Sequence, residues 1–159
     1  IEKYRPDLIW FDSWLDRIPQ KNRIEFVGAY LEAATQWKKP VVITYKQNDL
    51  PQNVGIVDFE KGRLDRLTEY AWLTDDTISA GLWTETGSWS YTKELDIKSS
   101  RELIHILVDI VSKNGNLLLN ISPRADGSIP IEQRHSLLGV GDWLINNGEA
   151  IYGTRPFKI

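Results

Sequence analysis

The 159-residue sequence contains no cysteine and no methionine. The absence of cysteine excludes disulfides, thiolate metal sites and a cysteine nucleophile. Only two histidines are present. Both His105 and His135 fall in segments with helical patterns, where we expect them to have core or surface roles. Neither histidine therefore indicates a metal site.

Clustered positive charge is also missing. The net charge is -3 and the pI about 5.4, and the only basic doublet, Lys38-Lys39, directly precedes Pro40, as is typical of a helix end. A nucleic-acid-binding surface would need lysines and arginines gathered on one face. No apolar run approaches the ~20 residues of a membrane span. We therefore expect neither nucleic acid nor a membrane as a partner.

The first 45 residues alternate between strand-like and helix-like segments. Residues 8–11 form a continuous apolar run of strand length, and residues 41–45 are rich in β-branched side chains. Between them, apolar residues recur at three-to-four spacing over residues 24–37, which predicts a helix that ends before Pro40. A strand, helix, strand order predicts a parallel sheet with helical crossovers, and thus the α/β class.

A second set of elements begins at a capping box. Ser99 and Glu102 have the spacing of this motif and predict the start of a helix, for which Gly115 is expected to supply the left-handed cap at the far end. Residues 116–121 predict another buried strand, and residues 131–146 a last amphipathic helix. Residues 46–99 show no clear helical period and are expected to hold long functional loops.

Asp12 lies at the carboxyl end of the first apolar segment, between Trp10 and Trp14. Catalytic groups of α/β barrels come from this end of the strands. A carboxylate there can attack the anomeric carbon of a sugar and form a covalent glycosyl-enzyme, while aromatic neighbours pack on the apolar face of the ring. The same position also suits an aspartate that caps a turn, and the pattern alone does not separate the two roles.

Four segments resemble the α-L-fucosidases of glycoside hydrolase family 29 and follow the order found in that family: residues 4–12, 107–123, 125–130 and 141–154. A complete (β/α)8 barrel typically takes ~250 residues. The resemblance therefore implies that residues 1–159 form the carboxyl-terminal portion, roughly half, of a catalytic (β/α)8 barrel. It also implies a retaining exo-hydrolase that releases terminal α-L-fucose with two carboxyl groups and with no metal or other cofactor.

The resemblance places the catalytic nucleophile at Asp12, within Trp10-Phe11-Asp12, and makes Trp10 a wall of the fucose pocket. Ser13 stands where the family usually has glycine, and its small side chain should be tolerated. Lys46 directly follows residues 41–45, in a region where the family has a basic residue. A cation there would keep Asp12 ionised. The alternative for Lys46 is an ordinary exposed lysine.

The acid/base is assigned from residues 57–63, which resemble the segment that carries this residue in one branch of the family. This makes Glu60 the candidate, with Glu85 and Glu69 as rivals. The alternative role of Glu60 is a solvated loop carboxylate paired with a neighbouring basic side chain.

Trp89 lies in a segment similar to the one whose aromatic residue lines the family's pocket beside the fucose methyl group. We take Trp89 as a substrate-binding candidate. We expect Trp72, Trp83 and Tyr91 to have core or loop-packing roles.

The family's earlier barrel strands supply histidines that bind the sugar, and the sequence has no counterpart of them. We therefore expect a complementary amino-terminal half, with self-association or a nicked enzyme as alternatives, and a fucosylated glycan as substrate. The alternative function is a non-catalytic half-barrel that binds carbohydrate or serves in assembly. A barrel hydrolase with another sugar preference is a third possibility. Family members are often secreted, periplasmic or lysosomal, and the sequence gives no compartment for this chain.

Overall fold

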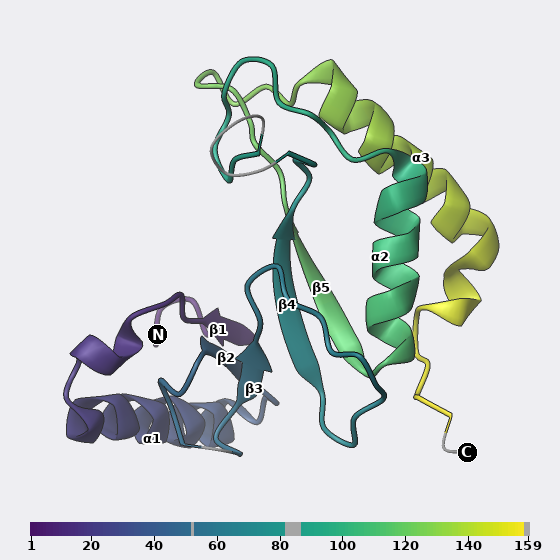
Figure 1. Cartoon of the computed structure of the whole chain (residues 1–159). Helices are drawn as coiled ribbons and strands as arrows, with labels where there is room; N and C mark the ends of the chain where they lie inside the picture. The colour runs from purple at the N-terminus through teal and green to yellow at the C-terminus, as the bar shows by residue number, and fades with distance from the viewer. Residues whose placement is uncertain (52, 82–86, 158–159) are drawn as a thin grey trace. The chain divides into compact units, whose positions relative to one another are not determined.

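The computed structural model describes residues 1–51, 53–81 and 87–157 of the chain. The chain divides into two compact units, residues 1–60 and residues 61–159. Each unit combines parallel strands with helices, as Figure 1 shows. The predicted α/β class is therefore confirmed in both units.

In residues 1–51 and 53–60, the first unit contains three short parallel strands and one long helix (Figure 1). Its elements are β1 (Leu8–Trp10), a 3-10 helix η1 (Leu15–Arg17), α1 (Gln20–Trp37), β2 (Val42–Lys46) and β3 (Ile56–Asp58). Both β1 and β3 pair in parallel with β2. The predicted strand, helix, strand order is confirmed, and β3 adds a strand in the region where loops were expected.

Helix α1 begins four residues before the predicted start at Ile24. Its first turn, residues 20–23, carries only polar and charged side chains, so the apolar spacing could not reveal it. The predicted end is confirmed, because Lys38 adopts a left-handed conformation with φ 54° and closes the helix before Pro40.

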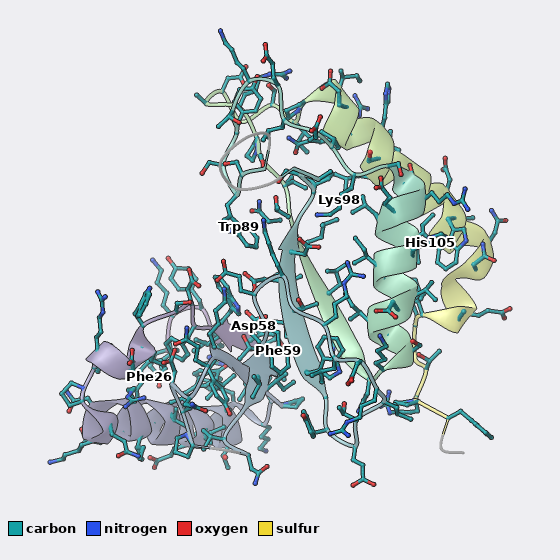
Figure 2. All side chains as sticks on the ribbon, in the orientation of Figure 1. Phe26, Asp58, Phe59, Trp89, Lys98 and His105 are labelled. Carbon is teal, nitrogen blue, oxygen red and sulfur yellow. The ribbon has the colours of Figure 1, made fainter. Side chains whose placement is uncertain are left out.

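Among its described residues, the second unit pairs two parallel strands with two α-helices (Figure 1). Its elements are β4 (Trp72–Thr77), α2 (Ser100–Ser112), β5 (Gly115–Asn120), α3 (Ile131–Asn147) and a 3-10 helix η2 (Gly148–Ala150). Helix α2 contacts both β5 and α3. Figure 2 shows His105 on α2 and Lys98 shortly before its start. His105 and His135 are both exposed, which agrees with a surface role.

The predicted capping box at the start of α2 is confirmed. The Ser99 hydroxyl accepts a hydrogen bond from the Glu102 amide at 3.3 Å, and the Glu102 carboxylate accepts one from the Ser99 amide at 2.7 Å. These two bonds satisfy backbone donors that have no partner inside the helix.

The predicted role of Gly115 as the left-handed cap of α2 is wrong. Asn114 is the residue with positive φ, 69°, and Gly115 is the first residue of β5. A Cβ atom on Gly115 would lie 2.5 Å from the ring of Trp72. Glycine is needed here because an indole ring packs directly against the backbone.

Strand β4 was missed, because its sequence carries two aspartates and two threonines among six residues. Asp75 and Asp76 are buried, against the usual exposure of aspartate. The Asp76 carboxylate lies 3.3 Å from the Lys98 ammonium and accepts a hydrogen bond from the Thr77 amide at 2.7 Å. Contacts with a residue far along the chain, rather than local apolar pattern, stabilise this strand.

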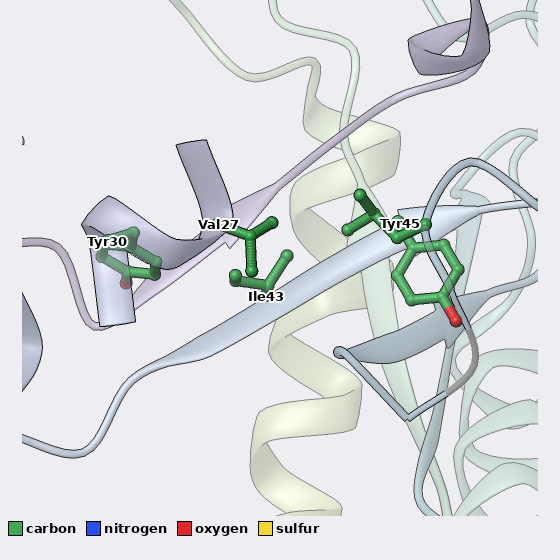
Figure 3. Packing of buried hydrophobic residues seen from close by; sticks show 5 residues of the cluster. Val27, Tyr30, Ile43 and Tyr45 are labelled. Carbon is green, nitrogen blue, oxygen red and sulfur yellow. The ribbon is translucent and has the colours of Figure 1, made fainter. Parts of the chain in front are cut away.

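The core of the first unit lies between α1 and β2. Figure 3 shows Val27 of α1 next to Ile43 of β2, with Tyr30 and Tyr45 in the same cluster. The Tyr30 hydroxyl donates a hydrogen bond to the Pro6 carbonyl at 2.9 Å, so its buried polar atom is satisfied. This packing fixes α1 against the strands whose ends carry the candidate site. In the second unit, Trp72 is fully buried, as expected for a core residue.

No helix in the described ranges is both long enough and apolar enough to cross a membrane. The same residues contain no group of three or more histidine, cysteine, aspartate or glutamate side chains placed to hold a metal ion.

Candidate active site

The parallel register of the first unit brings three strand ends to one edge. Trp10 lies beside Thr44, and Lys46 lies beside Asp58. The Phe11 amide donates to the Thr44 carbonyl at 2.9 Å, which carries the pairing one residue beyond β1. The polar residues that follow these strands therefore meet at their carboxyl ends, where catalytic groups of α/β barrels are found.

Lys46 connects the two candidate carboxylates. Its Nζ atom lies 3.1 Å from Asp12 Oδ1 and 3.1 Å from Glu60 Oε2. The Lys46 side chain is only 4% exposed, so it is not the ordinary exposed lysine that the sequence left open. A buried ammonium is costly unless it is paired, and the charged Asp12 carboxylate and the Glu60 carboxyl group are its partners. Because both oxygens lie 3.1 Å from one nitrogen, they are separated by no more than twice that distance.

Asp12 is held in its charged form by its neighbours. Burial raises its pKa, but hydrogen bonds from the Ser13 amide and from Lys46, together with the charge of Lys46, lower it by more. The net pKa lies below the ordinary value of an aspartate. Asp12 is therefore ionised at neutral pH, while its side chain is 67% exposed and accessible.

The bond from the Ser13 amide to Asp12 Oδ1, 2.8 Å long, is a local contact of the kind that a turn residue makes. The same oxygen also pairs with Lys46. Asp12 thus makes both the turn contact and a long-range ion pair, and Ser13 is accommodated beside it.

Trp10 is held by a residue that sequence analysis did not select. Its Nε1 atom donates a hydrogen bond to Asp58 Oδ2 at 2.7 Å, and the Lys46 ammonium lies 5.4 Å from the centre of its ring. Asp58 is the last residue of β3 and is 2% exposed. The sequence signal that could have found it is its place at a strand end, two residues before Glu60. Figure 2 shows Asp58 and Phe59 at the end of β3.

A cavity of about 420 Å³ opens at these strand ends. Its lining includes residues from the segment after β1, from the end of β2 and from the end of β3: Ser13, Tyr45, Lys46, Gln47, Asn48, Leu50, Val57, Asp58, Phe59 and Glu60. Its size is within the ~300–1,000 Å³ of small-molecule sites. A monosaccharide ring could be bound there by polar and aromatic groups together.

Trp89 belongs to the second unit and is described with that unit alone. Its carbonyl accepts hydrogen bonds from Asn120 Nδ2 at 2.8 Å and from the Ser122 hydroxyl at 3.4 Å. The Lys61 ammonium lies 5.1 Å from the centre of its ring. These hydrogen bonds hold the backbone at Trp89 next to the carboxyl end of β5.

Glu85 and Glu69 were the alternatives to Glu60 as the acid/base. Glu85 lies outside the described residues. Glu69 is exposed and precedes β4, so it lies toward the amino-terminal end of that strand, away from the end where barrel enzymes place their chemistry. The candidate Glu60 is the residue that the structure brings to Asp12, through their shared contact with Lys46.

The sequence matches a family model described as Alpha-L-fucosidase over residues 1–149. The tissue α-L-fucosidases of Rattus norvegicus and Homo sapiens are each 35% identical to it over 167 aligned positions, covering 100% of the chain and 34% of the relative. The chain thus spans about a third of the length of these curated relatives.

Solved structures show the same likeness. The Thermotoga maritima α-fucosidase in complex with fucose has a TM-score of 0.74 and 29% identity, and the match covers 98% of the chain and 32% of that protein. The Paenibacillus thiaminolyticus α-L-fucosidase isoenzyme 1 has a TM-score of 0.75 and 26% identity over 96% of the chain and 38% of that protein. This likeness confirms the expected fold class, α/β with part of a (β/α)8 barrel.

Proposed function

The chain belongs to the α-L-fucosidase family, and we propose that it carries the two catalytic carboxylates of a retaining exo-glycosidase that removes terminal α-L-fucose from glycoconjugates. Asp12 is the nucleophile and Glu60 the acid/base. Trp10, Lys46 and Trp89 bind the sugar.

This proposal rests on one observation: Asp12 and Glu60 both contact the buried Lys46 ammonium. Retaining glycosidases hold their two carboxyl groups ~5–5.5 Å apart, whereas inverting enzymes need ~6.5–9.5 Å to admit a water molecule. The Asp12 and Glu60 oxygens that contact Lys46 Nζ lie no more than twice 3.1 Å apart, a limit that includes the retaining separation. The spacing supports direct attack by Asp12.

The first step forms a covalent fucosyl-enzyme. An Asp12 oxygen attacks C1 of the fucoside, the bond between C1 and the leaving oxygen breaks, and Glu60 donates its proton to that oxygen. In the second step, Glu60 takes a proton from water as the water oxygen attacks C1, and the ester to Asp12 breaks. Fucose leaves, and both carboxyl groups return to their starting states.

Lys46 fits both steps. Its charge keeps Asp12 ionised before attack, as the lowered pKa of Asp12 indicates. After the ester forms, Asp12 no longer carries a charge, and Lys46 retains Glu60 as an ionic partner. Lys46 can therefore stabilise the negative charge of the site first on Asp12 and then on Glu60.

We propose that a complementary amino-terminal half completes the site. The chain covers 34% of its relatives' length, and a complete barrel takes ~250 residues. A fucosylated glycan would bind where the two halves meet. Self-association of two copies is the competing arrangement, and the native mass of the assembly separates the two.

The nucleophile is tested by Asp12→Gly. We expect hydrolysis of an aryl α-L-fucoside to be lost and azide to restore product formation in part, giving fucosyl azide with inverted configuration. Asp65→Gly, at an exposed aspartate of the second unit, is the matched control and should keep full activity. Full activity of Asp12→Gly would show that the nucleophile is another residue.

The assay should be run on the chain alone and then with an amino-terminal half. Release of the aryl group only in the second case would support the companion half. Binding of fucose with no release in either case would favour a non-catalytic carbohydrate-binding module. Faster release from an aryl galactoside than from the fucoside would indicate another sugar preference.

A further inference from the structure

Asp58 and Trp10 form a contact that the proposed reaction does not use. The Asp58 carboxylate is 2% exposed and accepts the indole N–H of Trp10 at 2.7 Å. Trp10 ends β1 and Asp58 ends β3, and each of these strands pairs with β2. The hydrogen bond therefore reaches across the middle strand, at the carboxyl ends where Lys46 lies.

The indole ring is held from two sides. A hydrogen bond to a carboxylate is stronger than one between neutral groups, and it fixes the direction of the N–H vector. The Lys46 ammonium stands 5.4 Å from the ring centre, a distance at which a cation is attracted to the face of the ring. Trp10 remains 36% exposed, so part of the ring is available to a ligand.

We propose that Asp58 is a positioning residue that sets the orientation of the Trp10 ring and so fixes one wall of the sugar pocket. The inference rests on the proposed function, because Trp10 contacts a sugar only if the site around Lys46 and Asp58 binds one. Asp58 acts through Trp10. A ring fixed in advance binds a sugar without first losing rotational freedom, which favours affinity.

The Trp10 indole N–H resonance tests the contact without any substrate. In the 15N-labelled chain, Trp10→Phe identifies this signal, which we expect downfield and slow to exchange with solvent. Asp58→Leu should move it upfield and speed its exchange about ten-fold or more, because the acceptor is lost. Asp58→Asn, which keeps an acceptor oxygen, should retain most of the protection.

Asp49→Leu is the matched control. Asp49 is also a buried carboxylate of the first unit, with a bond from the Asp16 amide at 3.3 Å. Its replacement should lower the melting temperature and leave the Trp10 signal in place. A Trp10 signal that is the same in Asp58→Leu and the parent chain would overturn the proposal.

Kinetics on an aryl α-L-fucoside test the consequence. We expect Asp58→Leu to raise KM about ten-fold and to change kcat by less than about three-fold, since Asp12 and Lys46 remain in place. A purely structural role would lower the active fraction, and hence kcat, with KM unchanged. In the Trp10→Phe background, which has no indole N–H, Asp58→Leu should raise KM no further.

An equal rise in KM in both backgrounds would show that Asp58 acts independently of Trp10 and would overturn the inference. Absence of fucoside turnover and of fucose binding in the parent protein would instead count against the proposed function. The Trp10 resonance still decides the role of Asp58 in that case, so the two failures are distinguishable.

Discussion

The Lys46 ammonium lies 3.1 Å from Asp12 Oδ1, and the lysine side chain is 4% exposed whereas that of the aspartate is 67% exposed. A buried cation thus meets a carboxylate that solvent and substrate can reach. This asymmetry suits a nucleophile, since the partner that must stay charged is protected and the partner that must react is open.

Replacement of Lys46 should change the pH dependence of catalysis. The pKa of Asp12 is lowered by the Ser13 and Lys46 hydrogen bonds and by the Lys46 charge, against the opposing effect of burial. Lys46→Met removes the charge, so this pKa should rise and the acid limb of the kcat/KM profile should move to higher pH. At neutral pH we expect a loss on the order of 100-fold.

Lys46→Arg keeps the positive charge and is the control for that experiment. Its acid limb should stay close to that of the parent protein. An acid limb at the same pH in Lys46→Met and the parent would contradict the electrostatic role of Lys46.

The capping box of α2 should contribute measurably to stability. Ser99→Ala removes the side chain that accepts from the Glu102 amide, and we expect the free energy of unfolding to fall by about 1 kcal/mol. Ser112→Ala, at the other end of the same helix, should stay within about 0.5 kcal/mol of the parent chain. Urea denaturation of the two variants gives the comparison, and equal losses would argue against a specific cap.

Gly115 and Gly28 should respond to alanine in opposite directions. A Cβ on Gly115 meets the Trp72 ring at 2.5 Å, so Gly115→Ala should destabilise the chain by about 1–3 kcal/mol. Gly28 lies on the exposed face of α1 with no atom within 4 Å of an added Cβ, so Gly28→Ala should stabilise it by about 0.5–1 kcal/mol. Thermal unfolding measures both, and a tolerated alanine at Gly115 would contradict the close packing.

Asn120 should control the order of the segment that carries Trp89. Its side chain donates to the Trp89 carbonyl at 2.8 Å, and Asn120→Ala removes this bond. We expect amide hydrogen exchange in residues 87–95 to accelerate about ten-fold and KM for the fucoside to rise several-fold. Asn116→Ala is the control from the same strand, because Asn116 donates to the Trp72 carbonyl instead. Equal exchange in the two variants would argue against an anchoring role.

Local motifs were predictable from the sequence. The Ser99 and Glu102 pair depends on residues three positions apart, and the end of α1 before Pro40 depends on its immediate neighbours. The positions of Asp12 and Lys46 at strand ends followed from apolar segments that could be recognised without the structure. These features require no knowledge of how distant segments pair.

Features that depend on pairing were not predictable. Strand β4 contains two buried aspartates, and one of them is compensated by Lys98, a residue more than 20 positions away in the sequence. The contact between Asp58 and Trp10 requires the register of three strands, and β3 was expected to be part of a loop region. Gly115 was assigned to the cap of α2 because nothing local shows that Trp72 packs against its backbone.

The central claim, that Asp12 is the nucleophile of a retaining fucosidase, is tested most directly by trapping the intermediate. The protein, completed by its amino-terminal half where the chain alone shows no turnover, is treated with 2-deoxy-2-fluoro-fucosyl fluoride, digested and examined by mass spectrometry. The account predicts one added fluorofucosyl group, on the peptide and residue corresponding to Asp12. A label on Glu60 or on any other carboxylate would contradict it.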